Sequence, residues 1–337
     1  MTMTVPAGVL TARDLVSPAM AKAADRLSQD VRLVAAYHLG LADADGQPVS
    51  GGTGKALRPA LALLSARAAG FEPERAVPAA AAVELVHNFS LLHDDIMDGD
   101  TERRHKPTAW TAFGVGPAIL AGDALLVLAQ DLLLENPPHG VWAARCLSAA
   151  VQRLIAGQGA DLAFERRDDV QVAECQDMAG DKTAALMACA CSIGAIFVGA
   201  PASLAMNLAG FGAHAGLAFQ LTDDLLGIWG ATEVTGKPVG SDLQARKKSM
   251  PVVIALNSGT AAGHELAELL ARTEALTQDE VDRAAKLVEA AGGREQTEAM
   301  ADTELASAIS CLDNAEMPDD VRAEFVAIAE FITARQW

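Results

Sequence analysis

The sequence predicts an all-α protein, and three observations support this fold class. Hydrophobic residues make up 51% of the 337 residues and are mostly Ala, Leu and Val, of which Ala and Leu are strong helix formers. Apolar positions recur at helical spacing over long stretches, and no run alternates as a half-buried strand does. The sequence has no internal repeat and no linker with a sharp change in composition. We therefore expect one domain over residues 1–337, of which 1–11 form a loose tail.

Each predicted helix follows from its apolar periodicity, and each break follows from glycine, proline or polar residues. The segment 77–98 is nearly all apolar before His87, which is typical of a buried central helix. The segment 230–250 has no periodicity, and loops of this length in compact domains are usually functional or disordered. The predicted helices cover residues 12–41, 57–69, 77–98, 114–134, 139–158, 171–198, 203–229, 250–257, 261–273, 278–291, 295–312 and 318–335, and the other predicted loops cover 42–55 and 99–109.

The chain is acidic, with 44 Asp and Glu against 26 Lys and Arg and a formal net charge of -18. A general nucleic-acid binder would need a basic face to neutralise phosphates, so we exclude nucleic-acid partners. An acidic protein that binds an anion must gather its few cations locally or recruit metal ions.

The cysteines and the chain start point to a cytoplasmic protein. The five cysteines form no CxxC pair and no zinc-ligand spacing, so we expect reduced, mostly buried thiols. Residues 1–10 lack the basic segment and apolar run of a signal peptide. Charges break the apolar runs before the about 18 residues of a membrane span, so we expect no stable span. The cysteines are Cys146, Cys175, Cys189, Cys191 and Cys311.

Three aspartates end the apolar helix predicted over 77–98, in the stretch HDDIMD. Asp94 and Asp98 are four residues apart and share a helix face, with Asp95 beside them. Carboxylates this close repel one another unless their pKa values are raised or a cation is bound. Hard oxygen ligands suit Mg²⁺, which often takes one or two carboxylates together with phosphate oxygens.

A second acidic pair, Asp223 and Asp224, follows another long apolar helix and precedes the glycine-containing segment 230–250. One such pair alone is usually a solvated helix end. Two pairs, both following apolar helices, favour a shared site in which they face each other across a cavity.

Cations stand near both pairs in the sequence and suit a diphosphate. Arg can bind phosphate as a bidentate fork, and Lys acts as a point charge. Any one of these cations could instead be a solvated surface residue, but Lys182 lies in an otherwise apolar helix, and a buried lysine needs a partner. The cations are Lys55, Arg58, Arg103, Arg104, Lys182, Lys237, Arg246, Lys247 and Lys248.

Together these motifs resemble the trans-isoprenyl diphosphate synthases, the polyprenyl synthetase family, and most of all its bacterial geranylgeranyl diphosphate synthases. The resemblance covers roughly residues 20–335, and its motifs come in the family's order. They are GKALRP at 54–59, His87, DDIMD at 94–98, Arg103-Arg104, Gly157-Gln158 with Asp161, Lys182-Thr183, Phe219-Gln220 with Asp223-Asp224, Gly236-Lys237 and Gly240-Ser241-Asp242.

The resemblance implies an isoprenoid synthase-type helical bundle around a central cavity, usually a homodimer, that condenses isopentenyl diphosphate with an allylic diphosphate. It implies three Mg²⁺, held by the two aspartate motifs, that clamp the allylic diphosphate. The implied metal ligands are Asp94, Asp95, Asp98, Asp223 and Asp224.

The resemblance also implies the residues that bind the two substrates. The implied contacts to the allylic diphosphate are Arg103, Lys182, Lys237 and Lys247, and the implied isopentenyl diphosphate pocket is Lys55, Arg58, His87 and Arg104. The implied polar groups near the reacting carbons are Thr183 and Gln220.

Two features of the motifs bear on metal binding and on the length of the expected product. The second motif normally carries a third aspartate, and here that place is Gly227, which removes one carboxylate. Five and four residues before Asp94 stand the bulky Phe89 and the small Ser90, with no insertion between the aspartates. Side chains one turn before the motif point along the elongation cavity. This pattern resembles synthases that make the twenty-carbon geranylgeranyl diphosphate, with the fifteen-carbon farnesyl diphosphate as the next choice.

Two other functions stay open at this stage. A terpene cyclase on the same scaffold would ionise a preformed polyprenyl diphosphate, and the altered second motif leaves room for it. A cyclase has no need of a complete isopentenyl diphosphate pocket, which favours elongation. A non-catalytic regulatory subunit should lose the first aspartate motif, which this chain keeps whole.

Overall fold

The all-α prediction is confirmed. The computed structural model describes residues 6–49, 56–104, 106–231 and 239–334, and it is 76% helical. Lys55 and Lys237, to which we assigned diphosphate contacts, lie outside the described residues. The helices are α1 Ala7–Ala24, α2 Gln29–His38, α3 Leu57–Ala68, η1 Pro73–Ala76, α4 Val77–Met97, α5 Ala109–Phe113, α6 Val115–Leu134, α7 His139–Phe164, α8 Val172–Ala179, η2 Gly180–Ala184, α9 Ala185–Phe197, α10 Ala202–Trp229, α12 Ser241–Gln244, α13 Met250–Asn257, α14 Ala261–Leu270, α15 Gln278–Ala290, α16 Gly293–Asp313 and α17 Asp319–Ile332.

The structure corrects two details near the N-terminus. The loose tail predicted over 1–11 is wrong for residues 7–11, which belong to α1. The reason is an apolar face that starts earlier than we expected, because Val9, Ala12 and Val16 are all buried. The single helix predicted over 12–41 is two helices, α1 and α2, separated by a short turn.

A small hairpin occupies the loop predicted over 99–109. Strands β1 Glu102–Arg103 and β2 Lys106–Pro107 pair antiparallel, with Arg103 opposite Lys106. Strands of two residues are too short to show alternation in the sequence. The hairpin follows α4 directly and brings Arg103 back towards the end of that helix.

The chain divides into two compact units. We call the first unit residues 1–151, 188–209 and 312–328, and the second unit residues 152–187, 210–311 and 329–337. Several helices run from one unit into the other, and the single domain predicted over 1–337 stays a prediction. Each unit is described below by itself.

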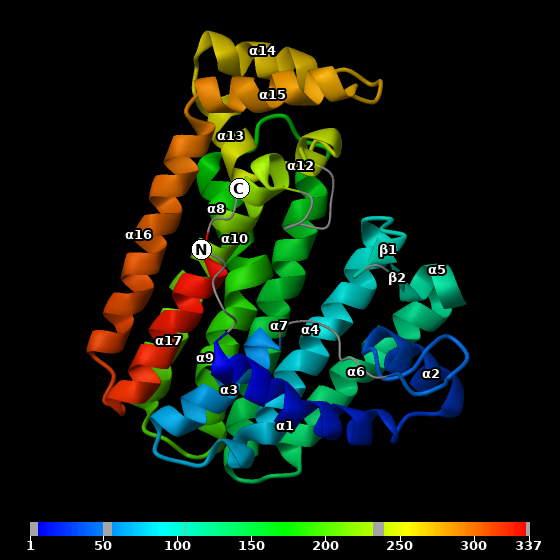
Figure 1. Cartoon of the computed structure of the whole chain (residues 1–337), viewed down its shortest axis with the longest axis vertical. Coiled ribbons are helices and arrows are strands. Elements are labelled where there is room, and N and C mark those ends of the chain that lie inside the picture. The colour runs from blue at the N-terminus through cyan, green and yellow to red at the C-terminus, as the bar shows by residue number, and fades with distance from the viewer. Residues whose placement is uncertain (1–5, 50–55, 105, 232–238, 335–337) are drawn as a thin grey trace. The chain divides into compact units, whose positions relative to one another are not determined.

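Helix α4 is the core helix of the first unit, as its apolar sequence predicted. It packs against α1, α3 and α6, and Figure 1 shows α4 in cyan beside α6. The run of alanines from Ala79 to Ala82 is fully buried, which lets the neighbouring helices approach closely. Pro78 stands in its first turn, and Gly99, with a φ of 69°, follows its C-terminus in the left-handed conformation that ends helices.

Two hydrophobic clusters organise the second unit. One joins Leu221 of α10 to Cys175 and Met178 of α8 and to Met250 and Val253 of α13. The other is built around α13, α14 and α15, the last two of which lie side by side in Figure 1. The first of these clusters includes Leu221, which precedes the second aspartate pair on α10, and it packs this part of α10 with α8 and α13.

All five cysteines are free thiols, as predicted, and three of them are buried. Two helical stretches, Val115–Leu134 and Val172–Phe197, are long and apolar enough to cross a membrane by length and composition alone, contrary to our expectation that charge interrupts every such run. The best window is 44% buried in the first stretch and 67% buried in the second. Buried core helices meet the same criterion, so the absence of a stable span stays a prediction.

Candidate active site

The first acidic cluster, Asp94, Asp95 and Asp98, lies on the last turn of α4. The amide of Asp98 donates to the carbonyl of Asp94 at 2.8 Å, so the turn that carries the three carboxylates is helical to its end. The C-terminal end of a helix carries partial negative charge and disfavours anions. Three carboxylates at this end therefore require nearby cations.

Asp95 is the most constrained member of the first acidic cluster, with 1% of its surface exposed. Its Oδ1 accepts a hydrogen bond from Arg103 Nε at 2.6 Å. Its Oδ2 is buried and has no hydrogen-bond partner among the described residues. Burial raises the pKa of Asp95, and the attraction of Arg103 opposes this shift. A buried carboxylate oxygen without a donor fits the place of a ligand to a hard cation such as Mg²⁺.

A second group of side chains in this unit, which we call the basic pocket, consists of Arg58, Arg103, Arg104 and Lys106 around His38 and His87. Burial lowers the pKa of His87 well below its usual value, and the charges of Arg58, Arg104 and Arg103 lower it further. Burial and the charges of Arg104, Arg103 and Lys106 lower the pKa of His38 to about 3. Both imidazoles are therefore neutral at neutral pH, in a field that attracts anions.

The charge of Arg58 is partly balanced by Glu84, a buried acid that we did not single out from the sequence. Burial lowers the pKa of Arg58, and the charge of Glu84 opposes this shift. Glu84 also accepts from Asn88 of the same helix, 3.4 Å away. Sequence reasoning also missed His38 and Lys106. Lys106 donates to the carbonyl of Tyr37 at 2.6 Å, and this pairing across 69 residues leaves no local signal.

Phe89 lies two turns before the end of α4 and is buried. Its ring meets the ring of His93 edge-on, with 4.8 Å between centroids. His93 Nε2 in turn lies 3.2 Å from the carbonyl oxygen of Ile119 on α6. The neighbouring Ser90 donates to the carbonyl of His87 at 2.9 Å. The ring of Phe89 therefore packs against His93, whose own side chain contacts the backbone of α6.

In the second unit, Asp224 is tied into a chain of hydrogen bonds. Its Oδ2 accepts from the amide of Met250 at 2.9 Å, and its Oδ1 accepts from Gln220 Nε2 at 2.8 Å. Gln220 Oε1 accepts from Thr183 Oγ1 at 2.6 Å. Asp224 is 4% exposed, and burial raises its pKa while Lys247 opposes the shift. The chain joins three residues that we singled out separately from the sequence.

Lys182 has the partner that its apolar surroundings required. Its Nζ donates to Asp161 Oδ2 at 2.5 Å. Lys182 and Thr183 lie in η2, a π-helical turn between α8 and α9, and such turns are frequent at functional sites. A Cβ at Gly157 of α7 would lie no more than 2.8 Å from Lys182 N, Lys182 Cα and Asp181 C. Only glycine lets α7 approach this turn so closely.

Lys247 faces the second acidic cluster, by which we mean Asp161, Asp223, Asp224 and Asp242. Burial lowers its pKa, but the combined attraction of these four carboxylates outweighs burial and leaves the pKa above its ordinary value. Lys247 therefore stays charged, and it binds the cluster as a counter-ion.

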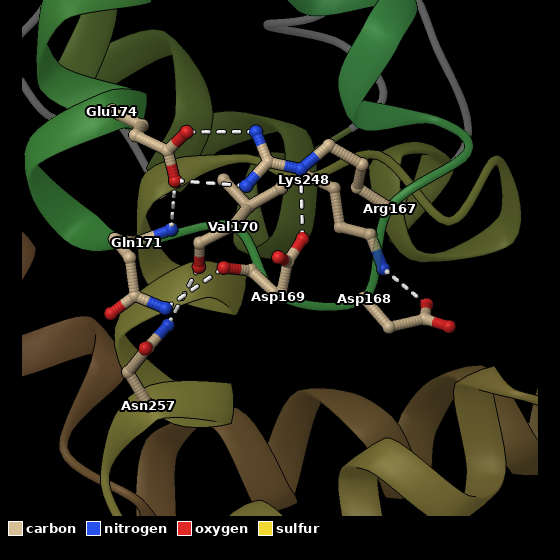
Figure 2. Close-up of polar contacts among 8 residues, drawn as sticks. All are labelled: Arg167, Asp168, Asp169, Val170, Gln171, Glu174, Lys248 and Asn257. Carbon is tan, nitrogen blue, oxygen red and sulfur yellow. Dashed lines mark hydrogen bonds and ion pairs between the residues drawn. The ribbon is translucent and has the colours of Figure 1, made fainter.

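Its two neighbours in the sequence bind elsewhere. Arg246 donates to the carbonyl of Glu274 through Nη2. Lys248 lies 3.6 Å from the exposed Asp168 in the segment after α7, which Figure 2 shows. In the same view Arg167 bridges to Glu174, which also accepts from the amide of Gln171 and so caps α8. Of the three consecutive cations only Lys247 faces the acidic cluster.

Among the residues that the structure describes, no three acidic, histidine or cysteine side chains form a ready-made metal cage. Mg²⁺ does not require such a cage, because it keeps several waters and takes one or two carboxylates plus phosphate oxygens from a substrate. The buried Oδ2 of Asp95 and the acid-rich second cluster both fit this type of shared site. That the two aspartate motifs face each other across a cavity stays a prediction.

Comparisons with known proteins agree with these motifs. Residues 47–288 match the family model described as Polyprenyl synthetase. The chain is 47% identical over 329 residues to a (2E,6E)-farnesyl diphosphate synthase of Mycobacterium tuberculosis H37Rv, and 43% identical over 328 residues to a geranylgeranyl diphosphate synthase of the same strain. Each match covers 96% of this chain and 92% of the relative.

The fold agrees as well. A crystal structure of a polyprenyl synthetase from Streptomyces coelicolor A3(2) is 50% identical, covers 98% of this chain and 100% of that chain, and superposes with a TM-score of 0.94. The aspartate motifs, the basic pocket, the family match and the shared fold lead to one assignment: the chain belongs to the polyprenyl synthetase family.

Proposed function

We propose that this chain, a trans-prenyltransferase of the short-chain isoprenyl diphosphate synthase type, makes geranylgeranyl diphosphate from isopentenyl diphosphate and an allylic diphosphate with Mg²⁺. The observation that carries the proposal is Asp95, a buried carboxylate with one oxygen bound by Arg103 and the other without a donor. A polar atom buried in this way is costly unless something binds it, and a divalent cation would remove the cost.

The metal set in this proposal is Asp94, Asp95, Asp98, Asp223 and Asp224, holding three Mg²⁺ with the allylic diphosphate. When bound, Mg²⁺ would offset the negative charge that develops on the departing diphosphate. Arg103 and Lys182 now neutralise Asp95 and Asp161. A cation bound at Asp95 would leave Arg103 available to the diphosphate, and Lys182, Lys237 and Lys247 would be the further cations that contact it.

The basic pocket suits the diphosphate of isopentenyl diphosphate. Arg58 and Arg104 carry fixed charge, and Lys55 is the further cation in this proposal. His87 is kept neutral, so it can donate a hydrogen bond to an anion without competing for the proton. Thr183 and Gln220 form a polar pair suited to hold charge near the reacting carbons.

The product length in this proposal depends on Phe89. The relatives at 47% and 43% identity carry different product names, so identity does not choose between fifteen and twenty carbons. A bulky ring that packs on His93, with the small Ser90 beside it, supports the twenty-carbon product.

Replacing Phe89 with Ala should lengthen the product, which mass spectrometry would measure. Phe113→Ala, which truncates a ring packed on Tyr37, is the matched control. An unchanged product spectrum in Phe89→Ala would contradict this floor model.

A single incubation separates elongation from the cyclase alternative. The purified protein is given Mg²⁺ and farnesyl diphosphate, with and without isopentenyl diphosphate. We expect a longer diphosphate only when both substrates are present. A hydrocarbon formed without isopentenyl diphosphate would show a cyclase, and no reaction under either condition would favour a regulatory subunit.

The proposed assembly is a homodimer in the cytoplasm. Helix α6 exposes Leu120 and Val127 at 58% and 60% of their surface, and Trp142 on α7 of the same unit is 58% exposed. Leu120 and Val127 are seven residues apart and so share one face of α6, and exposed apolar side chains on one face suit a contact with a second protein chain. We expect a dimer in light scattering and no binding to phosphatidylcholine vesicles. Leu120→Lys with Val127→Lys should give a monomer.

A further inference from the structure

The missing third aspartate of the second motif has a spatial counterpart. Gly227 lies on α10, four residues after Asp223, so a side chain at 227 would share the helix face of Asp223. A Cβ built at Gly227 would lie no more than 2.8 Å from Oδ2, Cγ and Oδ1 of Asp242. The carboxyl group of Asp242 therefore occupies the space beside Asp223 where a side chain at 227 would begin.

The backbone holds Asp242 in this place. Ser241 Oγ lies 3.5 Å from the carbonyl oxygen of Gly227, and the amide of Lys247 donates to the carbonyl of Asp242 at 2.8 Å. Gly240, just before α12, has a φ of 76°, which turns the chain into this short helix. The approach of α12 to α10 thus comes from several contacts and does not depend on the Asp242 side chain alone.

The charge around Asp242 is unbalanced. Asp242 and the other three carboxylates of the second acidic cluster act on Lys247, and Lys182 pairs with Asp161 of this cluster. Among the side chains that the structure describes, four formal negative charges therefore face the two positive charges of Lys247 and Lys182. Such an excess is stabilised by a further cation, and oxygen ligands favour a divalent one.

We propose that Asp242 replaces the carboxylate that Gly227 lacks, so that Asp223, Asp224 and Asp242 together bind the divalent cation of the second motif. The inference rests on the proposed function. It goes beyond it because it assigns a metal-binding role to a residue outside the motif and gives a reason for Gly227: any side chain there would displace the carboxyl group of Asp242.

The competing explanation is structural. In that case Asp242 only pairs with Lys247 and positions α12, and Gly227 only makes room for it. The two explanations differ in metal binding, because a structural role affects the unfolding temperature without changing the affinity of the folded protein for a cation.

The test measures Mn²⁺ bound to the full chain by water proton relaxation enhancement, with inorganic pyrophosphate and a protein-free blank. The variants are Asp242→Asn, Asp242→Glu, Gly227→Asp and the exchange Gly227→Asp with Asp242→Gly. Asp282→Asn removes an acid that is exposed on α15 of the same unit and serves as the control. Circular dichroism and the unfolding temperature of each variant report its folding.

We expect Asp242→Asn to weaken Mn²⁺ binding about tenfold or more, the scale on which metal sites respond to loss of a supporting group. Gly227→Asp alone should also weaken binding, because two carboxyl groups then compete for one space. The exchange should recover binding to within about threefold of the wild type, and Asp242→Glu should fall between. Asp282→Asn should match the wild type.

Three outcomes distinguish metal binding by Asp242 from a purely structural role and from a failure of the proposed function. Unchanged Mn²⁺ affinity in Asp242→Asn overturns the inference, whatever its unfolding temperature. A folded exchange variant that stays as weak as Asp242→Asn overturns it as well. A wild-type protein that binds no Mn²⁺ contradicts the metal binding in the proposed function instead.

Discussion

The two acidic clusters differ in the charge that surrounds them. The first, at the end of α4, adjoins the basic pocket, in which burial lowers the pKa values of His38 and His87 and the charges of the nearby cations lower them further. The second is dominated by carboxylates, which raise the pKa of Lys247 above its ordinary value although burial lowers it. One region is thus built to attract an anion, and the other is built to attract a cation.

This difference shows how an acidic protein can bind a diphosphate. Its net charge is -18, so a uniform surface would repel the ligand. Concentrating arginines beside one cluster and leaving carboxylates in excess at the other gives two local fields of opposite sign. The following predictions test each field, from the largest expected effect to the smallest.

Asp95→Asn should cause the largest loss, because it removes the buried carboxylate that we assign to a metal ion. We expect kcat to fall about 10²–10³-fold, the range for loss of one preorganised electrostatic group. Steady-state kinetics at saturating Mg²⁺ would measure it. Glu102→Gln, an exposed acid on β1, is the control and should stay within about twofold of the wild type. Retention of more than a third of the activity by Asp95→Asn would remove Asp95 from the metal set.

Lys247→Met should destabilise the second cluster, because it removes the cation on which all four of its carboxylates act. A buried pair costs about 3–5 kcal/mol when one partner is removed, and we expect about 2 kcal/mol here because Lys247 is half-buried. Urea unfolding in EDTA would measure the loss, and Mg²⁺ should recover part of it.

The control for Lys247→Met is Lys248→Met, which keeps the aliphatic stem and loses only a pair with the exposed Asp168. It should cost about 1 kcal/mol or less. Equal losses in the two variants would mean that the acidic field at Lys247 does not matter for stability.

The neutral His38 predicts a pH dependence. Its pKa is about 3 in the folded chain and ordinary when unfolded, so the unfolded chain binds more protons below about pH 6.5. Stability contributed by His38 is complete above this pH and falls by about 1.4 kcal/mol per pH unit down to about pH 3. Urea unfolding at several pH values should show a shallower fall in His38→Gln. Arg104→Gln, which removes one of the cations, should lie between, and parallel profiles in all three proteins would contradict a basic field at His38.

Thr183→Val should have the smallest effect. It removes one neutral hydrogen bond to Gln220 and leaves the bond from Gln220 to Asp224 intact. One such bond is worth about 1 kcal/mol, so we expect kcat to fall about fivefold. Thr303→Val on α16 removes an exposed hydroxyl bonded to its own helix and should be neutral. A loss as large as that of Asp95→Asn would give Thr183 a greater role than positioning Gln220.

The sequence by itself determined most of the helices and proposed the candidate site residues. The central α4 and its aspartates follow from periodicity and spacing along one segment, because a helix brings residues three and four apart onto one face. The hairpin after α4 and the start of α1 escaped this reasoning. Two-residue strands show no alternation, and the missed start of α1 offers only one buried side chain, Val9, among residues 8–11 as a signal.

Only the tertiary structure decided which charges meet. The family resemblance selected Lys247 from the run Arg246, Lys247 and Lys248, but only the structure shows that, of these three, Lys247 faces the second acidic cluster. Likewise Gly227 reads as a lost carboxylate until Asp242, fifteen residues away, is found in its space. Such pairings depend on contacts between segments that are distant in the chain, and local periodicity carries no information about them.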